Sequence, residues 1–523
     1  MSSRTETALS SVWPDLSHMS LLLLAGLCLL TVSYVLYQRF FHPLASVPGP
    51  FWASISRLWI TKHSWDGDMS VTMIALHKKH GSLVRTGPNE VSVADLSAIK
   101  TIYGAGTRFR KSLWYSVWQG HRQFDLFAER DERIHGEQRR LVSRAYSMDA
   151  LKEYEQYVDD AIEVFLGHMS ERQNQVVDMG NWVQLFAFDV IGEITFSKRF
   201  GFMDAAADDG SFQQIEGALK SAAWIGQLPT LYWIHDALMP YIGNHLGITA
   251  RHGSLRNFAV KEIAARQDRG SDHQDILAKL KATQKEKPVE MNENNVASMA
   301  TSNIFAGSDT TAISTRAIIY YLLKNPQCKQ RLVEEIDSMR SKGQLSDPVK
   351  LAEAEKMPYL QAVMYEALRL HPAVGMSLPR STPQGGATIA ETHIPAGTVV
   401  GANPWVIHRS EEVFGEDVDS FIPERWMKED NGDMHRFFFA FGSGARMCLG
   451  RNISWMEMSK LIPTLFMHYH LELSEPEKEW TMNCWWFVMQ HGVNVRLSKR
   501  HFRDLKKPED RNQNNIKNPK INP

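Results

Sequence analysis

Residues 441–450, FGSGARMCLG, combine one cysteine with three glycines and an arginine. Cys448 is followed by an apolar, helix-forming run from Leu449 to Phe466. We therefore expect its sulfur at or just before a helix N-terminus, where backbone N–H groups and the helix dipole favour a thiolate. Glycines let the backbone turn sharply or approach a ligand closely, and Arg446 adds a fixed cation. The pattern predicts a thiolate that ligates the metal of a flat, anionic ligand.

A second stretch, Ala306-Gly-Ser-Asp-Thr-Thr311, lies within a run of helical periodicity. Gly, Ser, Asp and Thr all have low helix propensity, and five such residues in succession lead us to expect a local defect in the helix. The Thr310 hydroxyl is expected to bond the carbonyl of Ala306 and fray the helix, while Gly307 leaves open space beside it. Simple back-bonding in a buried helix is the alternative. The pattern predicts a groove lined by a hydroxyl and by the Asp309 carboxyl.

The spacing Phe441-x-x-Gly444-x-Arg446-x-Cys448-x-Gly450 resembles the haem-binding loop of the cytochromes P-450, the haem-thiolate monooxygenases. Five fixed residue types at this spacing arise by chance on the order of once in several thousand chains of this length. The alternative is an inert cysteine in a Gly-rich turn. The resemblance implies haem b as cofactor, with Cys448 as the axial thiolate of its iron. It also implies that Thr310 binds dioxygen and that Asp309 supplies protons.

Four cations are expected to contact the two haem propionates by the same resemblance. These are Arg446, Arg380 in Leu378-Pro-Arg380, and His135 and Arg139 in His135-Gly-Glu-Gln-Arg139. The family usually has Trp where this chain has His135, so the contact of His135 with a propionate stays open.

The pair Glu366 and Arg369 has the i,i+3 spacing that places both charges on one face of a helix. The same pattern occurs in Glu137-Gln-Arg-Arg140, and most such pairs are solvated. The resemblance implies that Glu366, Arg369 and Arg425 form a buried network beneath the haem, because a buried charge is tolerated only when it is paired.

The elements that position these residues are mostly helical. With 523 residues, of which 43% are hydrophobic and 22% charged, the chain can bury a large core as one domain or two. Helical periodicity is found in six segments: Leu151–Met169, Val183–Thr195, Ser254–Arg266, Val296–Lys324, Gln327–Met339 and Pro358–Leu370. Strands are expected in a hairpin at Val84–Val93, around Ile394–Val400 and at Val493–Leu497. We expect a mainly α fold with a small β region, the cytochrome P-450 fold.

Near the N-terminus, Met19–Tyr37 is a run of nineteen residues without a charge, long enough to span a bilayer. A cleaved signal peptide is the alternative, but no basic cluster precedes the run and no small-x-small cleavage site follows it. We expect a luminal segment (1–18), a transmembrane anchor (19–38), a Pro/Gly hinge (39–50), a haem-thiolate monooxygenase domain (51–503) and a disordered tail (504–523). Arg39, Arg57 and Lys62 after the anchor, against Arg4 alone before it, place the domain in the cytoplasm. The resemblance to microsomal family members implies the endoplasmic reticulum membrane.

The formal net charge of −1 gives no reason to expect nucleic acid as a partner. The four cysteines lack paired spacing, which argues against a disulfide framework or a zinc site. No Gly-x-Gly-x-x-Gly loop occurs, so we expect electrons from an NADPH-dependent cytochrome reductase, with cytochrome b5 as a possible second donor.

The resemblance places a substrate pocket along five largely apolar segments: 114–127, 224–233, 303–310, 373–378 and 485–489. A lipophilic small molecule is expected there, with Asn303, Ser377 or Gln490 available to orient a polar group. The region from Leu378 to His408 is most similar to fungal microsomal members, including those similar to pisatin demethylase, which indicates secondary metabolism. Two alternatives stay open: a haem-thiolate isomerase or dehydratase that needs no reductase, and a membrane haem-binding protein without turnover.

Overall fold

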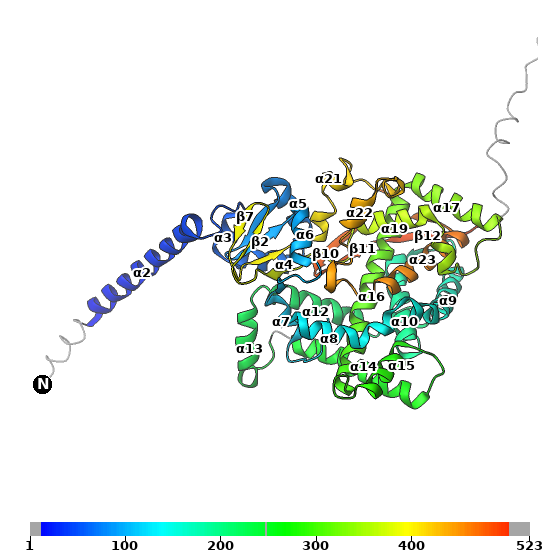
Figure 1. The fold of residues 1–523 in the computed structure, drawn as a ribbon, viewed down its shortest axis with the longest axis horizontal. Helices are drawn as coiled ribbons and strands as arrows, with labels where there is room; N and C mark the ends of the chain where they lie inside the picture. Colours follow the sequence, from blue (N-terminus) through cyan, green and yellow to red (C-terminus); the bar gives the residue numbers. More distant parts are fainter. Residues whose placement is uncertain (1–11, 246–247, 501–523) are drawn as a thin grey trace, which may run out of the picture.

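The computed structural model describes residues 12–245 and 248–500. It consists of one long N-terminal helix that projects from a globular body (Figure 1). The predicted tail 504–523 and the first eleven residues of the predicted luminal segment lie outside the described residues.

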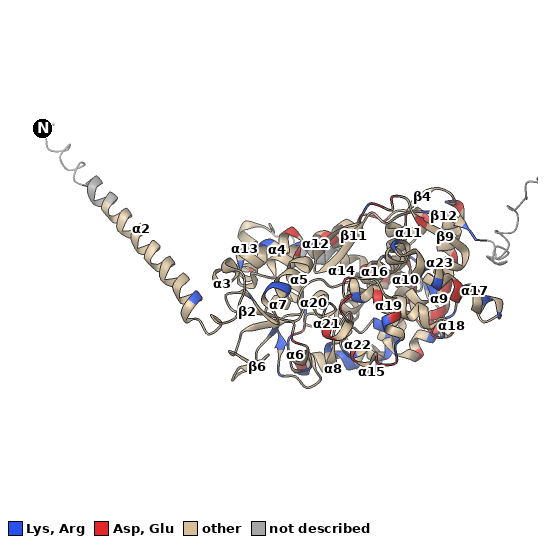
Figure 2. Ribbon diagram, turned by 90° about the horizontal axis from the view of Figure 1, so that it is seen from above, with Lys and Arg blue, Asp and Glu red and all other residues tan. Residues whose placement is uncertain are grey.

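The projecting helix is α2, Val12–Leu36, which continues as one π-helical turn, η1, Tyr37–Phe41. Residues His18–Phe41 are long and apolar enough to cross a membrane, and none of their most apolar window is buried against the body. Figure 2 shows this helix almost free of charged residues until its end beside the body. Helical geometry therefore extends past the predicted boundary at residue 38 and stops at His42, because Pro43 disfavours a helical conformation of the residue before it.

A five-stranded sheet lies at the end of the body nearest α2 (Figure 1). Its strands run in the order β1-β2-β8-β5-β3, namely Leu83–Gly87, Glu90–Val93, Val399–Gly401, Arg380–Ser381 and Arg110–Lys111. The predicted hairpin at Val84–Val93 is confirmed as β1 and β2. β8 is parallel to β2, and the other pairs are antiparallel.

Short strands are present around Ile394–Val400, as predicted, but a turn separates two of them. The first part of this range belongs to β7, Thr392–Ile394, which pairs with β6, Ala387–Ile389, and the last part belongs to β8. Pro395 lacks an N–H for a ladder, and Gly397 has a φ of 76°. Two further sheets are the hairpin β10–β11, Thr481–Trp485 and Phe487–His491, and the sheet β4-β12-β9, Val176–Asp178, Asn494–Lys499 and Tyr469–Leu473. The predicted strand Val493–Leu497 is confirmed within β12.

All six predicted helices are confirmed, five of them within a longer element and the sixth, α19, with the predicted bounds. They are α9 Met148–Glu171, α10 Met179–Phe196, α14 Ile248–Arg269, α16 Glu293–Lys324, α17 Pro326–Ser341 and α19 Pro358–Leu370. The apolar run after Cys448 forms α23, Arg451–His468.

The remaining helices are at most fifteen residues long. They are α3 Phe51–Ile55, α4 Leu58–Asp66, α5 Met69–His80, α6 Leu96–Tyr103, α7 Trp114–Gln119, α8 Glu132–Val142, η2 Ser143–Tyr146, α11 Phe202–Ala205, α12 Ser211–Ile225, α13 Pro229–Ile242, α15 Ile276–Glu286, α18 Leu351–Ala354, α20 Pro404–Ile407, α21 Glu411–Phe414, η3 Pro423–Met427, α22 Gly432–Arg436 and η4 Gly444–Arg446.

The 32-residue helix α16 runs through the middle of the body (Figure 1). It packs against α10, α14, α19 and α23, and most of its side chains are buried. The main apolar core includes side chains from Ile60 in α4 to Leu497 in β12. The fold is mainly α with a small β region, as predicted.

Candidate active site

The cysteine segment forms a tight loop directly before α23. Cys448 donates its backbone N–H to the Phe441 carbonyl over 2.9 Å, which closes the loop, and α23 begins three residues later at Arg451. Gly442 and Gly444 have φ angles of 70° and 64°, values that other residues rarely adopt. The cysteine therefore lies just before a helix N-terminus, as expected.

The sharp turn expected of the loop glycines is found at Gly442 and Gly444, but packing adds a second constraint that was not predicted. A Cβ atom on Gly444 would lie 1.9 Å from the carbonyl oxygen of Tyr103, so the close approach of α6 also requires a glycine here. Gly450 has a φ of −83°, and a Cβ atom there would meet nothing within 4 Å. Neither the turn nor packing within the described residues requires a glycine at 450.

The Cys448 thiol is accessible to solvent, yet protein atoms surround it on most sides. Burial raises its pKa, whereas the backbone N–H groups of Gly450 and Arg451 and the charge of Arg139 lower it. A bound metal cation would favour the thiolate further. The loop thus presents one sulfur with several donors around it.

Helix α16 packs against α23 beside this loop, and the Thr311 hydroxyl donates to Ser454 Oγ over 3.0 Å. The Thr310 hydroxyl donates to the Ala306 carbonyl over 2.7 Å, which is the predicted back-bond. Ala306 is exposed and Thr310 partly exposed, although their neighbours Ser308 and Asp309 are buried. One face of α16 therefore remains accessible beside the cysteine loop.

Two details of the predicted groove are wrong. Helix α16 is continuous from Glu293 to Lys324, so the back-bond does not interrupt it. A Cβ atom on Gly307 would lie 2.8 Å from Ile191 Cδ1, so Ile191 of α10 fills the space beside this glycine. Gly307 allows the two helices to approach closely.

The Asp309 carboxyl is buried between α16 and α10, and Gln184 of α10 donates to its Oδ1 over 2.8 Å. Burial raises the pKa of Asp309 to about 7, against the charge of Arg316 and the hydrogen bond from Gln184, which lower it. Near neutral pH the carboxyl therefore exists in both protonation states. Such a group can hold and release a proton.

The predicted cations lie on separate elements around the cysteine loop. Arg139 of α8 donates to the Met447 carbonyl over 3.0 Å. Arg446 pairs with Glu132 at 2.8 Å and donates to the Glu129 carbonyl over 2.7 Å. The Arg446 guanidinium thus already binds the carboxylate of Glu132 with some of its N–H groups.

Lys111, which was not predicted, belongs to the same group. It is the register partner of Arg380 across β3 and β5, and like charges directly opposite one another destabilise a sheet. Burial lowers the pKa of Lys111 well below its ordinary value, and the charges of Arg380 and Arg446 lower it further. An anion bound here would relieve this repulsion.

His135 lies among these cations, and it is buried. Burial lowers its pKa to about 3, and Arg446, Lys111, Arg139 and Arg380 lower it further. The imidazole is therefore neutral and offers one N–H donor. Its place in the group fits the prediction, but it adds no positive charge.

These residues fit a haem. Its iron requires one protein thiolate, and Cys448 beside the accessible face of α16 is the residue that would provide it. Its propionates carry two negative charges, which match the four basic side chains of Lys111, Arg380, Arg139 and Arg446, of which Lys111 and Arg380 are buried. The register pairing of Lys111 with Arg380 is the observation that fits an anionic partner here.

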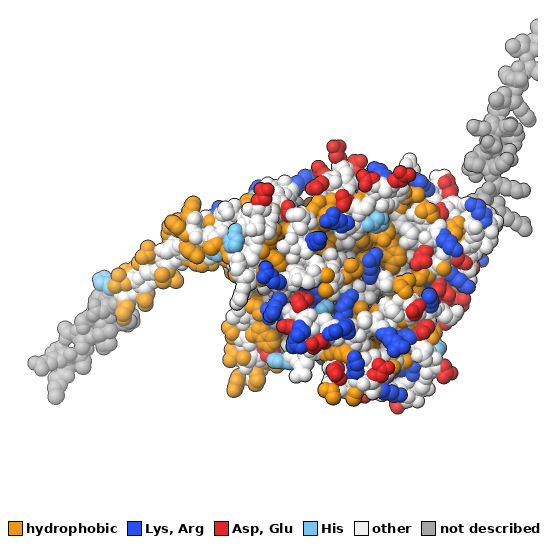
Figure 3. Space-filling view, viewed as in Figure 1, with side chains coloured by type: hydrophobic (Ala, Val, Ile, Leu, Met, Phe, Trp, Pro, Cys, Tyr) orange, Lys and Arg blue, Asp and Glu red, His pale blue; other side chains and the backbone are white. Residues whose placement is uncertain are grey.

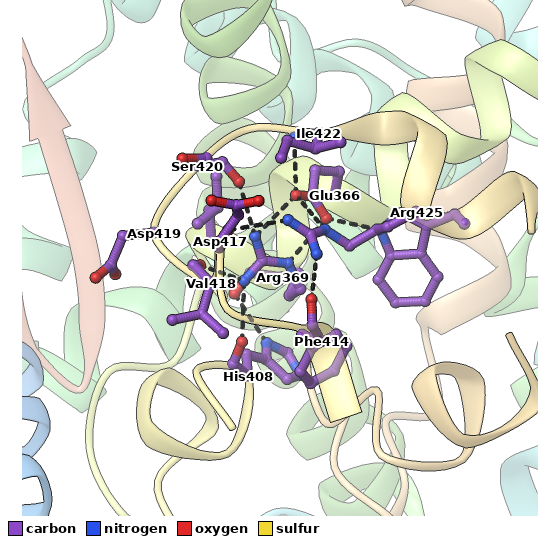
Figure 4. A network of polar contacts seen from close by, with 12 residues as sticks. Glu366, Arg369, His408, Phe414, Asp417, Val418, Asp419, Ser420, Ile422 and Arg425 are labelled. Carbon is purple, nitrogen blue, oxygen red and sulfur yellow. Dashed lines mark hydrogen bonds and ion pairs between the residues drawn. The ribbon is translucent and has the colours of Figure 1, made fainter. Parts of the chain in front are cut away.

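The predicted network of Glu366, Arg369 and Arg425 is present and fully buried (Figure 4). Arg369 donates to both carboxylate oxygens of Glu366 over 2.8 Å, and Arg425 donates to one over 2.9 Å. Trp426 and the backbone of Ile422 supply two further donors to Glu366. Burial would raise the pKa of Glu366, but the two arginines outweigh it and the pKa is lowered.

His408 connects this network to the cysteine loop. Arg369 donates to the His408 carbonyl over 3.0 Å (Figure 4), and the His408 ring lies 3.0 Å from the Arg369 carbonyl. The other ring nitrogen accepts the N–H of Phe439 over 2.7 Å. Phe439 is two residues from Phe441, so the network supports the start of the loop.

Three of the five predicted pocket segments, 114–127, 303–310 and 485–489, contact one another through aromatic side chains. The Trp118 ring of α7 lies 6.0 Å from that of Phe305, and Phe305 lies 6.1 Å from Phe487 of β11. At the tip of the β10–β11 hairpin, Trp486 lies 4.7 Å from Trp114. Aromatic side chains from three elements thus surround this side of the helix.

Two of the three predicted polar groups already have partners. Gln490 donates to the Ile313 carbonyl over 2.9 Å, and Asn303 Oδ1 accepts from the Tyr146 hydroxyl. The Asn303 amide nitrogen is buried without a partner among the described residues. Ser377 is partly buried.

Sequence reasoning missed Lys111, Gln184, Arg316 and His408. None of these lies in a recognisable motif, and each acquires its role from contacts with segments far away in the chain. Gln184 and Arg316, for example, are 132 residues apart and in contact.

The comparisons with known proteins agree with this geometry. A sequence model of the family described as Cytochrome P450 matches residues 46–497. The chain is 40% identical over 469 residues to Cytochrome P450 monooxygenase hepC of Aspergillus oryzae, covering 86% of this chain and 92% of that protein. It is 37% identical over 480 residues to Cytochrome P450 monooxygenase cicH of Emericella nidulans, covering 88% and 94%. It is 35% identical over 463 residues to Pisatin demethylase of Fusarium vanettenii, covering 87% and 89%.

Proposed function

Because the chain belongs to the cytochrome P450 family and is a haem-thiolate monooxygenase, we propose that it oxidises a lipophilic small molecule at a membrane, in fungal secondary metabolism. The source of the relatives and the name Pisatin demethylase support this setting. The aromatic side chains of α7, α16 and the β10–β11 hairpin support a lipophilic substrate.

The bound haem supplies the activation of dioxygen, and the chain supplies the thiolate, the proton and the enclosure. Cys448 holds the iron from the side of α23. Asp309 holds a proton near neutral pH, and the Thr310 hydroxyl lies on the accessible face of α16. We assign proton delivery to these two residues. The buried Asp309 carboxyl, which Gln184 holds between α16 and α10 next to Thr310, is the structural observation that supports a proton relay, which an isomerase does not need.

We expect Thr310→Ala to divert electrons from product to hydrogen peroxide. The hydroxyl bonds only its own helix, so folding and haem binding should change little. NADPH oxidation through the reductase should continue, while the ratio of product to peroxide falls by about 10²-fold or more. NADPH consumed, peroxide formed and product formed are measured together.

Thr301→Ala is the matched control, because Thr301 makes the same back-bond, to the Ala297 carbonyl, in the same helix. It should behave like the wild type. Equal slowing of every step in Thr310→Ala would refute the role given to Thr310. Product from the wild type without NADPH, reductase or oxygen would favour the isomerase instead.

Membrane attachment at the endoplasmic reticulum is proposed to involve more than α2. Exposed apolar side chains also cover α13, which lies at the end of the body nearest α2 in both orientations (Figures 1 and 2) and is largely hydrophobic on its surface (Figure 3). These side chains are Leu231, Ile234, Leu238, Tyr241 and Ile242, and the exposed Trp52 and Leu58 belong to the same end. An apolar surface of this kind favours contact with a lipid bilayer.

We expect deletion of residues 1–36 to convert firm attachment into peripheral binding. The deletion retains Gln38, whose carbonyl and amide oxygens bind the buried Arg85 guanidinium. The truncated protein should bind haem, resist salt washing through α13, and be released by alkaline carbonate that leaves the full-length chain in place. Membrane flotation before and after each wash is the measurement. Carbonate resistance of the truncated protein would mean a second integral segment.

Electron delivery is proposed to occur from an NADPH-dependent cytochrome reductase, with cytochrome b5 as a possible second donor. Helix α8 contacts the cysteine loop through Arg139, and Arg140 and Arg144 are exposed on α8 and η2. Arg436 of α22 is also exposed. Basic side chains close to the iron-binding loop would attract an acidic redox partner.

A further inference from the structure

We infer that Gln184 and Arg316 hold the Asp309 carboxyl in one orientation, so that its proton is carried on Oδ2. This inference rests on the proposed role of Asp309 as a proton donor, and it assigns two positioning residues to that role. Neither residue is within the cysteine loop or the aromatic walls of the substrate side.

The three side chains form one buried chain of contacts between α16 and α10. Arg316 Nη2 donates to Gln184 Oε1, and Gln184 Nε2 donates to Asp309 Oδ1 over 2.8 Å. Arg316 is itself held by the Gly180 carbonyl, to which its Nε donates over 2.7 Å. All three side chains are at most 6% exposed.

Arg316 determines which way the Gln184 amide faces. A guanidinium has only donors, so the amide must turn its oxygen towards Arg316 and its nitrogen towards Asp309. The opposite orientation would place two donors against one another in a buried interface. Gln184 is therefore a donor to Asp309 in both protonation states of the carboxyl.

A fixed donor on one oxygen decides where the carboxyl proton resides. A carbonyl oxygen accepts an N–H better than a hydroxyl oxygen does, so Oδ1 remains the carbonyl and the proton binds Oδ2. Oδ2 is buried and has no hydrogen-bond partner among the described residues. The proton is thus held on the oxygen that no protein group engages, from which it can be passed on.

Few charges act on this carboxyl. Arg316 of α16 lowers its pKa, and Glu216 of α12 raises it slightly. Asp178, which precedes α10, acts on Arg316 and raises its pKa, while burial lowers the pKa of Arg316 to about 10. Arg316 is therefore charged at every pH at which the enzyme would work, and the amide keeps its orientation.

Infrared spectroscopy of the resting ferric holoprotein, without substrate, tests the orientation directly. The C=O stretching band of protonated Asp309 is identified as the band that Asp309→Asn removes below pH 7. We expect it at a higher frequency in Gln184→Met, because the carbonyl loses its donor. Arg316→Met should split it into two bands, since the amide can then present either end.

The pH dependence of coupling gives a second measurement that a purely structural role would not change. In the wild type the share of electrons that reaches product should fall as the pH rises through about 7, where Asp309 loses its proton. Gln184→Met should move this midpoint upwards by about one pH unit, the size expected when a hydrogen bond to the charged form is lost. Thr310→Ala should raise peroxide without moving the band or the midpoint.

An unchanged band and an unchanged midpoint in Gln184→Met would overturn the inference. If Gln184→Met does not fold, Gln184→Asn, which withdraws the amide by one methylene, should shift the band in the same direction. A different result would separate the two roles: a shifted band in Gln184→Met together with a normal share of electrons reaching product in Asp309→Asn. It would refute the proton-donor role of Asp309 while leaving the orientation by Gln184 intact.

Discussion

Replacing Cys448 by serine should abolish the monooxygenase activity and remove the red-shifted Soret band that the reduced, carbon monoxide-bound protein shows with a thiolate ligand. The serine hydroxyl stays neutral at every accessible pH, so the iron loses its only anionic protein ligand. Because electron donation from the thiolate supports dioxygen cleavage, product formation should fall to background. Absorption spectra of the reduced carbonyl complex and product analysis are the measurements.

Cys328→Ser is the matched control for this substitution. Cys328 is partly buried in α17, so this variant exchanges sulfur for oxygen without touching the loop before α23. It should retain the thiolate spectrum and the activity. A normal thiolate spectrum in Cys448→Ser would contradict the assignment of Cys448 as the ligand.

Replacing Glu366 by glutamine should largely prevent accumulation of the haem-containing protein. The substitution keeps the shape but removes the charge, and it leaves Arg369 and Arg425 buried beside a neutral amide. Breaking a buried, fully hydrogen-bonded pair costs about 3–5 kcal/mol, out of a net stability of about 5–15 kcal/mol for a folded protein. Haem content per polypeptide and the urea concentration at half-unfolding are the measurements.

Glu137→Gln is the control for the charge change. Glu137 is exposed and pairs with Arg133 over 2.7 Å, and losing such a surface pair should alter the free energy of unfolding by about 0.5 kcal/mol or less.

The free energy of unfolding of the two variants should also depend differently on pH in the acid range. Because the folded protein lowers the pKa of Glu366, its contribution is present at neutral pH and is lost as the pH falls below the ordinary glutamate range. Equal stability of Glu366→Gln and Glu137→Gln would refute the role of the network.

The sequence pattern alone could not distinguish the buried Glu366 from the exposed Glu137. Both residues begin the same Glu-x-x-Arg pattern, and only the resemblance favoured the first. In the structure Glu366 binds Arg369 in the core, whereas Glu137 turns to Arg133 at the surface and Arg140 bonds its own helix. Burial separates the two cases, and burial depends on which segments pack over each helix.

The helices and the cysteine loop could be predicted because their causes are local. Helical periodicity, the proline and glycine positions and the apolar run after Cys448 each act over a few residues. The turn between the two strands around 394–400 also has a local cause, since Pro395 lacks an N–H for a ladder and Gly397 has a positive φ. The continuity of α16 through its Thr310 back-bond shows that packing against α10 outweighs weak local propensity.

The sequence by itself determined the loop that carries the proposed metal ligand, the mainly α fold and the presence of an N-terminal apolar helix. Each of these depends on residue types at short, fixed spacing, which any folded arrangement must respect. Only the tertiary structure decided that Lys111 opposes Arg380, that His135 is neutral, and that Gln184 stands between Asp309 and Arg316. Those features depend on desolvation and on interactions between charges from distant segments. The size of both effects is set by how the interior packs, which the order of residues along the chain does not show.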